Sequence, residues 1–190
     1  MRNWLYDQGI FRSTGFGPCI ISVGNLTVGG TGKTPMVEYI AEYLKGKCRV
    51  GILSRGYKRK TRGFILAGPD DNAETIGDEP FQYRLKYGND ITVAVGEDRV
   101  HAIPRMTNQR ADLEVIILDD AYQHRSVIPD LNILLTDFSR PFYRDHVMPV
   151  GWLRERRKNA SRASAVVVTK CPEDLGEEAQ QLIAGEIRKY

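Results

Sequence analysis

The chain has 190 residues, of which 42% are hydrophobic and 27% are charged, and its formal net charge is +3. This length and composition suffice for one α/β domain with a sizeable core and leave no room for a second full domain. The small net charge does not indicate a nucleic-acid-binding protein. The three cysteines are far apart and lack CxxC spacing, which indicates neither a disulfide framework nor a zinc site and favours a reducing cytosol. No apolar stretch approaches the roughly 18 residues of a membrane-spanning helix, and the N-terminus lacks the apolar region of a signal peptide.

The first twelve residues, MRNWLYDQGIFR, combine aromatic and aliphatic side chains with two arginines. That composition suits the interface of a lipid bilayer. A short helix that caps the domain would explain the same residues equally well, so both interpretations stay open.

Apolar runs of strand length then recur along the chain, and they are continuous rather than alternating and rich in Val and Ile. This pattern is typical of strands covered on both faces, as in a parallel sheet. Because helical segments fall between several of these runs, we predict an α/β fold with a doubly wound, mostly parallel sheet and helices on both faces, which the glycine-rich loop described next makes P-loop NTPase-like. The expected strands are 19–24, 49–54, 91–96, 113–120, 131–137 and 164–170, and the expected helices are about 33–45, 78–87, 97–110 and 176–189.

The first of these strands leads into GNLTVGGTGKTP, residues 24–35, where glycines surround one lysine. A strand, a glycine loop and a helix in this order form an anion cradle, because the helix N-terminus exposes unpaired N–H groups and a positive dipole end. In this P-loop interpretation the glycines let the backbone approach the phosphates, Lys33 reaches the β- and γ-phosphates, and the Thr34 hydroxyl binds Mg²⁺. The alternative is an ordinary glycine-rich turn at a helix start.

The loop departs from the standard GxxxxGK[ST] pattern, because Thr27 stands where the first glycine belongs. It is closer to the KGGxGKT variant of partition-type ATPases, although Val28 replaces their signature lysine. The residues expected to bind the nucleotide are Asn25, Thr27, Val28, Gly29, Gly30, Thr31, Gly32, Lys33, Thr34 and Pro35.

A long, charged, turn-rich segment follows the second strand and ends in GDEP, residues 77–80. Within it only GFILA resembles a strand, and long loops of this kind are usually functional or mobile. The motif itself has two interpretations. Asp78 and Glu79 could form an acidic cap before Pro80 at a helix start. Alternatively, Asp78 is the base for a substrate hydroxyl and Glu79 a metal or orienting ligand.

The run VIILDD ends in Asp119 and Asp120, and a P-loop needs such carboxylates at a neighbouring strand end to hold its Mg²⁺. A turn or capping pair of aspartates is the alternative. Gln123 and His124 follow a few residues later, beyond the carboxyl edge of the sheet, where α/β proteins bind ligands. A lone histidine is nevertheless more often a structural hydrogen-bonding group.

The irregular stretch 138–162 carries Arg154 and Glu155 within PVGWLRER and is rich in Lys and Arg. Its basic run, which comprises Arg156, Arg157, Lys158 and Arg162, is either a solvated face or a grip for an anionic substrate or a phospholipid surface. The last strand ends in VVVTKCP, where Pro172 occupies the position of the aspartate that reads guanine in [NT]KxD motifs. This difference favours ATP over GTP.

Together, RNWLYDQGI, ISVGNLTVGGTGKTP, SRGY, GDEP, ILDDAYQH, PVGWLRE and VVVTK occur in an order and spacing that resemble the tetraacyldisaccharide 4'-kinase family, the lipid A 4'-kinases. The resemblance spans residues 2–170. It implies transfer of the γ-phosphoryl group of ATP to the 4'-hydroxyl of a lipid A disaccharide 1-phosphate, as a step of lipopolysaccharide biosynthesis at the cytoplasmic face of the inner membrane. The implied catalytic residues are Asp78, as base, with Lys33, Asp120, His124 and Arg154, and Glu155 belongs to their surroundings. The implied Mg²⁺ site comprises Thr34, Glu79, Asp119 and Asp120.

Family members usually have a longer N-terminal amphipathic helix and a smaller C-terminal lobe. We therefore expect residues 1–190 to be the N-terminal P-loop lobe of a kinase, with weakened peripheral membrane contact. Two other functions remain open. One is a partition-type or metallocentre-assembly NTPase switch, against which Val28 and the GDEP acids argue. The other is a catalytically incomplete nucleotide-binding lobe.

Overall fold

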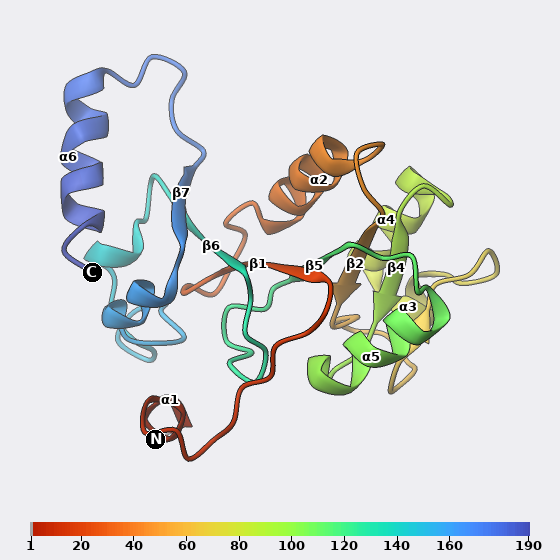
Figure 1. The fold of residues 1–190 in the computed structure, drawn as a ribbon. Helices are drawn as coiled ribbons and strands as arrows, with labels where there is room; N and C mark the ends of the chain where they lie inside the picture. The colour runs from red at the N-terminus through yellow and green to blue at the C-terminus, as the bar shows by residue number, and fades with distance from the viewer. Residues whose placement is uncertain (1) are drawn as a thin grey trace.

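The structure is a computed structural model that describes residues 2–190. In this part of the chain a seven-stranded sheet has the order β3-β4-β2-β5-β1-β6-β7 (Figure 1). All neighbouring strands are parallel except β3, which runs antiparallel to β4 at the sheet edge. The strands are β1 (Cys19–Asn25), β2 (Val50–Ser54), β3 (Ile65–Leu66), β4 (Thr92–Val95), β5 (Val115–Asp119), β6 (Leu131–Asp137) and β7 (Ala165–Thr169).

The helices connect these strands in the alternation that the sequence predicts. They are α1 (Arg2–Asp7), α2 (Lys33–Leu44), α3 (Ala73–Ile76), α4 (Asp78–Tyr87), α5 (Arg99–Gln109) and α6 (Glu177–Ile187), with 3₁₀ turns η1 (Phe142–Arg144) and η2 (Arg157–Arg162). The six predicted strands and four predicted helices are confirmed to within a few residues at each end. The GFILA segment supplies the short β3, and the N-terminal segment forms the short helix α1.

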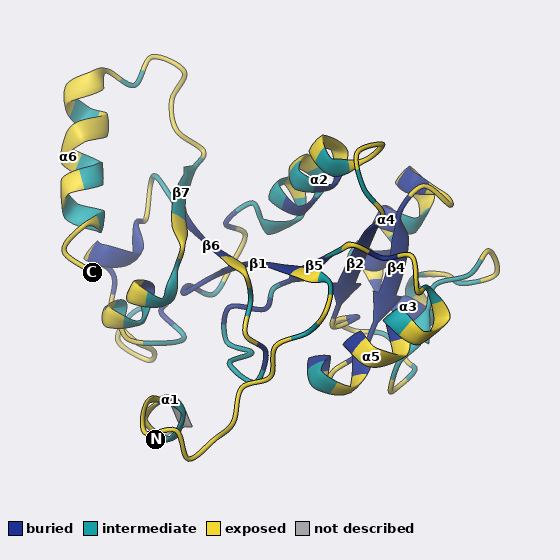
Figure 2. Ribbon diagram, in the orientation of Figure 1, coloured by how far each residue is buried: buried dark blue, intermediate teal, exposed yellow. Residues whose placement is uncertain are grey.

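The sheet is covered on both faces, as the continuous apolar strands predict. On β1 the alternating side chains divide between two hydrophobic clusters: Ile21 and Val23 pack with residues of α2 and α4, whereas Ile20 packs with residues of α5. Figure 2 shows the central strands buried between helices whose outer sides are exposed. The predicted arrangement of helices on both faces is therefore confirmed.

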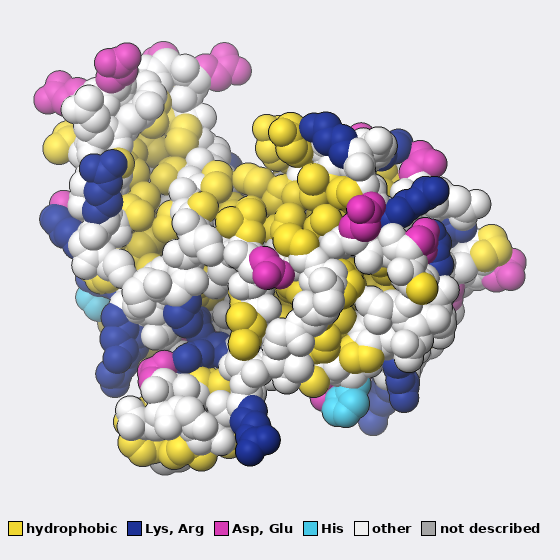
Figure 3. All heavy atoms as spheres, viewed as in Figure 1, with side chains coloured by type: hydrophobic (Ala, Val, Ile, Leu, Met, Phe, Trp, Pro, Cys, Tyr) yellow, Lys and Arg dark blue, Asp and Glu magenta, His cyan; other side chains and the backbone are white. Residues whose placement is uncertain are grey.

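The β7 end of the sheet is more open than its centre. A third cluster packs residues of η1 and the 153–160 region against β6, and Ile183 of α6 is only partly buried against it. No residue of α6 is fully buried. Figure 3 shows hydrophobic side chains in view between α6 and α2. Met36 and Ile40 of α2 and Val167 of β7 are only partly buried. None of the helices described within residues 2–190 is long and apolar enough to cross a bilayer.

Candidate active site at the carboxyl edge of the sheet

A cavity of about 990 Å³ opens at the carboxyl ends of β1, β2 and β5. The chain leaves β1 toward β2 on one side and leaves β5 toward β6 on the other side, and α/β proteins bind ligands at such a switch point. The cavity is lined by Gly29, Gly30, Thr31, Gly32, Lys33, Thr34, Pro35, Ser54, Arg55, Tyr57, Glu79, Glu97, Asp119, Asp120, Gln123, His124 and Arg154. Most of the residues expected from the sequence therefore meet in one place.

The P-loop has the backbone that its glycines predict. Gly29 and Gly32 have φ angles of 118° and 80°, a conformation that side chains with a Cβ rarely adopt, and α2 begins directly after Gly32. The side chain of Asn25, fully buried at the end of β1, donates to Thr31 Oγ1 at 2.7 Å and to the Gly29 carbonyl at 3.4 Å. These contacts fix the loop from inside.

Three residues expected at the nucleotide do not line the cavity. Asn25 and Thr27 are buried beneath the loop, and the Val28 N–H donates to the Trp152 carbonyl at 2.8 Å. They determine the shape of the loop, whereas Gly29 to Pro35 form its cavity wall.

Asp119 is the last residue of β5 and is only 5% exposed. Burial, and then the neighbouring Asp120 carboxylate, raise the pKa of Asp119 to about 6. The buried hydroxyl of Tyr83 in α4 donates to Asp119 Oδ2 at 3.3 Å, and burial raises the pKa of Tyr83 as well. The neighbouring groups therefore offset the cost of burying the Asp119 carboxylate only in part. This is typical of a carboxylate that binds a cation.

Asp120 follows in a left-handed conformation, with φ of 47°, which is a costly arrangement for a residue other than glycine. Its carboxylate lies 3.6 Å from Lys33 Nζ and 3.2 Å from Arg154 Nη1. Arg154 is held against the loop by its own backbone, since its N–H donates to the Leu26 carbonyl at 2.7 Å. Residues from three distant segments therefore bring two cations to one carboxylate at the P-loop.

The two acids of GDEP lie differently. Glu79 lines the cavity, whereas Asp78 is exposed at the first position of α4 and does not line it. Gly77 is the N-cap of α4, and no side chain caps this helix by a hydrogen bond. A capping hydrogen bond therefore does not explain Asp78, although both acids lie in the first turn of α4 as the helix-start interpretation expects, and the role of Asp78 as a base remains a prediction.

Several polar residues of this site were not assigned to it from the sequence, although the SRGY motif contains Arg55 and Tyr57. Arg55 and Tyr57 follow the end of β2, and Glu97 follows β4. The guanidinium of Arg99, 1% exposed, donates to the carbonyls of Gly96 and, at 3.2 Å, Asp119, and burial lowers its pKa to about 10. Polar residues directly after a buried strand were the available signal, because the carboxyl ends of parallel strands meet at one edge.

The donors at this edge fit Mg²⁺ that arrives with a nucleotide. Among residues 2–190 no three His, Cys, Asp or Glu side chains are grouped as a metal site. Carboxylates of Asp119 and Asp120 and the Thr34 hydroxyl are hard oxygen donors, and Mg²⁺ commonly takes one or two protein carboxylates together with phosphate and water oxygens. The buried Asp119 carboxylate in the cavity wall, with its pKa raised by burial, is the observation that favours a cation here.

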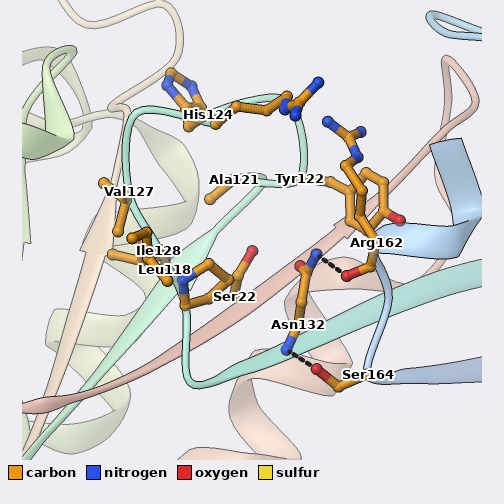
Figure 4. A pocket seen from close by; sticks show the side chains of 12 residues that line it. Ser22, Leu118, Ala121, Tyr122, His124, Val127, Ile128, Asn132, Arg162 and Ser164 are labelled. Carbon is orange, nitrogen blue, oxygen red and sulfur yellow. Dashed lines mark hydrogen bonds between the residues drawn. The ribbon is translucent and has the colours of Figure 1, made fainter. Parts of the chain in front are cut away.

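A smaller cavity, of about 220 Å³, lies against the sheet face that also packs on α5 (Figure 4). Ser22 and Asn132 are register partners on β1 and β6 and both line it. Asn132 donates from Nδ2 to the Arg162 carbonyl at 3.0 Å, and its N–H donates to Ser164 Oγ at 3.0 Å. Of the expected catalytic residues only His124 lines this cavity, so the predicted site corresponds to the larger one.

Comparison with known proteins agrees with this geometry. A family described as tetraacyldisaccharide-1-P 4'-kinase (LpxK) matches residues 1–189. The tetraacyldisaccharide 4'-kinase of Flavobacterium johnsoniae is 51% identical over 95% of this chain and 53% of the relative. The enzyme of the same name from Bacteroides thetaiotaomicron is 46% identical over the whole chain and 50% of the relative.

Among solved structures, the crystal structure of LpxK from Aquifex aeolicus in complex with ATP superposes with a TM-score of 0.79 at 39% identity, covering 93% of this chain and 57% of that chain. The present chain thus spans about half the length of the curated relatives that it matches. With a family match over nearly every residue and a shared fold, this chain belongs to the tetraacyldisaccharide-1-P 4'-kinase family.

Proposed function

We propose that this chain carries the ATP-binding core of a kinase that transfers the γ-phosphoryl group of ATP to the 4'-hydroxyl of tetraacyldisaccharide 1-phosphate, in lipid A biosynthesis. The observation that carries the proposal is the convergence of Lys33, Asp120 and Arg154 at a P-loop cavity large enough for a nucleotide. Membership of the kinase family supports the acceptor, and the ATP complex of the Aquifex relative supports ATP as the donor.

The proposed chemistry depends on position and charge rather than on covalent participation. Backbone N–H groups of residues 29–34 bind the phosphates, apart from that of Thr31, which donates to the Gly29 carbonyl at 3.1 Å. Lys33 lies at the β- and γ-phosphates and Arg154 at the charge that develops on the transferred group. Both cations contact Asp120 in this structure, so incoming phosphate oxygens replace its carboxylate as their partner. Asn25, Thr27 and Val28 keep the loop in shape.

Asp78 is the proposed base for the 4'-hydroxyl. Asp78 is exposed at the start of α4, next to Glu79 in the cavity wall, so a lipid acceptor that approaches from the membrane can reach it. His124 and Gln123 line the cavity beside the acid pair and are proposed to orient the acceptor. Glu155 is proposed as support, because it pairs with Arg162 at 2.5 Å and accepts from Asn159 at 3.0 Å.

Asp119, Asp120, Glu79 and Thr34 are proposed to hold Mg²⁺ between them and the nucleotide. When bound, the ion would neutralise charge on the β- and γ-phosphates. The protein's contribution is to keep Asp119 ionised and oriented, through the Tyr83 hydroxyl on Oδ2 and the Arg99 guanidinium on the adjacent carbonyl.

Labelled ATP, offered with lipid A disaccharide 1-phosphate in detergent, tests the proposed reaction. We expect label on the lipid with the unmodified chain and none with Lys33→Ala. Release of phosphate without labelled lipid would support the NTPase switch instead. Binding of ATP with neither reaction would support a nucleotide-binding lobe, in which residues 1–190 need a further lobe for catalysis.

We also propose peripheral contact with the cytoplasmic face of the bacterial inner membrane, through α1 and the turn after it. Trp4, Ile10 and Phe11 are 57%, 58% and 43% exposed, and Figure 3 shows hydrophobic side chains on the outer side of this segment. The segment is fixed to the domain by Arg125, which pairs with Asp7 at 2.7 Å and donates to the Asn3 carbonyl at 2.8 Å. Exposed aromatic groups on an anchored helix suit an interface.

Co-sedimentation with vesicles tests this contact. We expect binding to vesicles that contain anionic lipid, and a loss of at least about thirtyfold in the partition coefficient for Trp4→Ala combined with Phe11→Ala, since each buried aromatic side chain contributes on the order of 1 kcal/mol or more. Tyr39→Ala, which removes an exposed aromatic group of α2 (68% exposed), is the matched control. Equal binding by all three proteins would contradict the role of α1.

A further inference from the structure

The outer side of the P-loop is held by the end of β7. Thr169 Oγ1 donates to the Thr31 carbonyl at 3.0 Å, and Lys170 Nζ donates to the Gly30 carbonyl at 2.6 Å. Two adjacent residues of one strand end thus bind two consecutive carbonyls of the loop. Asn25 holds the same loop from the inside, so the loop is gripped from both sides.

Peptide geometry converts the contact at the Thr31 carbonyl into a direction for one N–H group, whereas the N–H that follows the Gly30 carbonyl, that of Thr31, donates to the Gly29 carbonyl at 3.1 Å and closes the loop on itself. In a trans peptide the C=O and the following N–H point in opposite directions. Because the Thr31 carbonyl is fixed toward Thr169, the N–H of Gly32 points away from β7, toward the concave side of the loop. Gly32 directly precedes α2, at the position where phosphate-binding loops present N–H groups to an anion.

Lys170 is itself fixed in place. Its ammonium pairs with Asp137 Oδ2 at 2.7 Å, and Asp137 also accepts hydrogen bonds from Ser139 at 2.7 Å and 2.9 Å. The cation is therefore already neutralised by a carboxylate, which suits a residue that orients backbone better than one that binds phosphate directly. Its backbone is left-handed, with φ of 57°, a conformation that glycine adopts at lower energy because it has no Cβ.

We propose that Thr169 and Lys170 are positioning residues of the P-loop, which hold the Gly30 and Thr31 carbonyls outward so that the loop is ordered for polyphosphate before any nucleotide arrives. The part of this inference that concerns nucleotide affinity rests on the proposed function. The order of the loop can be measured without nucleotide, so the positioning role and the proposed function can fail separately.

The decisive variant is Lys170→Gly. It removes the ammonium and at the same time relieves the left-handed backbone, so the free energy of unfolding is expected to stay unchanged or to rise. Thr169→Val removes the other donor with little change of shape. Lys170→Arg keeps a cation that can reach the same carbonyl. Lys60→Met is the matched control, because Lys60 is an exposed lysine in a 2.7 Å ion pair with Glu74 away from the loop.

Three measurements are compared: backbone ¹⁵N order parameters of residues 29–32 without nucleotide, the Kd for Mg²⁺ with a non-hydrolysable ATP analogue, and urea unfolding. For Lys170→Gly we expect order parameters to fall from about 0.85 toward 0.6 and the Kd to rise about tenfold, with undiminished stability. Thr169→Val should raise the Kd about threefold. Lys170→Arg should restore most of the affinity, and Lys60→Met should change neither quantity.

The proposal is overturned if Lys170→Gly leaves the loop order and the Kd at their unmodified values. It is also overturned if the Kd rises only in proportion to a loss of unfolding free energy, because the contacts would then serve stability alone. If the loop loses order in Lys170→Gly while no version of the chain binds the analogue, the positioning role stands and the proposed nucleotide function falls.

Discussion

The two sides of the P-loop use charge in opposite ways. Toward β5 and α4, Asp119, Tyr83 and Arg99 are almost completely buried. Toward β6 and β7, Lys170 is 56% exposed in its pair with Asp137. Both sides adjoin the phosphate-binding loop, yet the three residues on the buried side are shielded from solvent whereas Lys170 is not.

The difference teaches which contacts determine stability and which determine geometry. A buried carboxylate with a raised pKa opposes folding at neutral pH until a cation arrives, because desolvation disfavours its charged form. An exposed ion pair contributes between about 0 and 1 kcal/mol to stability, yet it can still fix the direction of a peptide group. Substitutions on the buried side should therefore change both activity and the free energy of unfolding, whereas substitutions on the exposed side should change the free energy of unfolding only slightly.

Lys33→Ala removes the lysine of the P-loop itself, and it should have the largest effect. Transfer to lipid is expected to fall at least about a thousandfold, since Lys33 contacts Asp120 and is the group proposed to neutralise the transferred phosphate. Steady-state assays with labelled ATP measure the loss. Lys45→Ala at the other end of α2, where an exposed pair with Asp90 at 3.0 Å is lost, should retain normal activity. Comparable activity in the two variants would remove Lys33 from the mechanism.

Asp119→Asn sharpens the comparison, because this substitution on the buried side should make the protein more stable and less active. The pKa of Asp119 lies at about 6 in the folded chain, above the ordinary value of 3.8. A raised folded pKa means that this group favours folding most at low pH, and that its contribution is lost as the pH rises from about 4 to about 6. Without metal the variant should therefore be more stable than the unmodified chain at pH 7, by about 3 kcal/mol, and equally stable below pH 4.

Urea unfolding in chelator from pH 4 to pH 8 measures this difference, and transfer to lipid should fall at least about a hundredfold in the same variant. Asp112→Asn is the control: Asp112 is exposed before β5, and its pKa is lowered by Arg110, so its replacement should bring no gain at neutral pH. A difference in unfolding free energy that does not depend on pH would show that burial does not raise the pKa of Asp119 in the folded chain.

Asp78→Asn tests the exposed acid that the cavity does not include. We expect turnover to fall about a hundredfold, as for the loss of a general base, while the Kd for ATP changes less than about twofold. Because no side-chain capping bond is lost at α4, the melting temperature should stay within a few degrees. Stopped assays, equilibrium binding and thermal melts on one preparation separate these effects, with Glu74→Gln in the exposed helix α3 as the matched control. Normal turnover would exclude Asp78 as the base.

The sequence predicted the fold well because its signals are local. Continuous Val and Ile runs separated by helix-length segments indicate a parallel sheet, and glycines followed by GKT indicate where the loop and α2 meet. The pairing of β1 with both β5 and β6 was not stated by any local pattern, since strand order depends on which faces the helices cover.

The site was predicted in part, for a similar reason. Lys33, Asp119 and Asp120 lie within recognisable motifs, and the structure brings them to one cavity. Arg99 and Lys170 were not predicted, because each contacts the site through a backbone carbonyl. Arg99 donates to the Asp119 carbonyl, and Lys170 donates to the Gly30 carbonyl. Such contacts leave no spacing in the sequence and follow only from how the strand ends meet.

Asp137→Asn, on the exposed side, should have the smallest effect. Lys170 and then Ser139 lower the pKa of Asp137 to about 2. A lowered folded pKa adds stability above pH 4 that is lost as the pH falls toward 2, and because solvent screens this pair the amount should be below about 1 kcal/mol at pH 7. Urea unfolding of the variant and the unmodified chain at pH 7 and at the lowest pH where both stay folded measures the difference. A loss of several kcal/mol at pH 7 would contradict the contrast between the two sides, because it would mean that the β7 side stabilises the fold as strongly as a buried contact does.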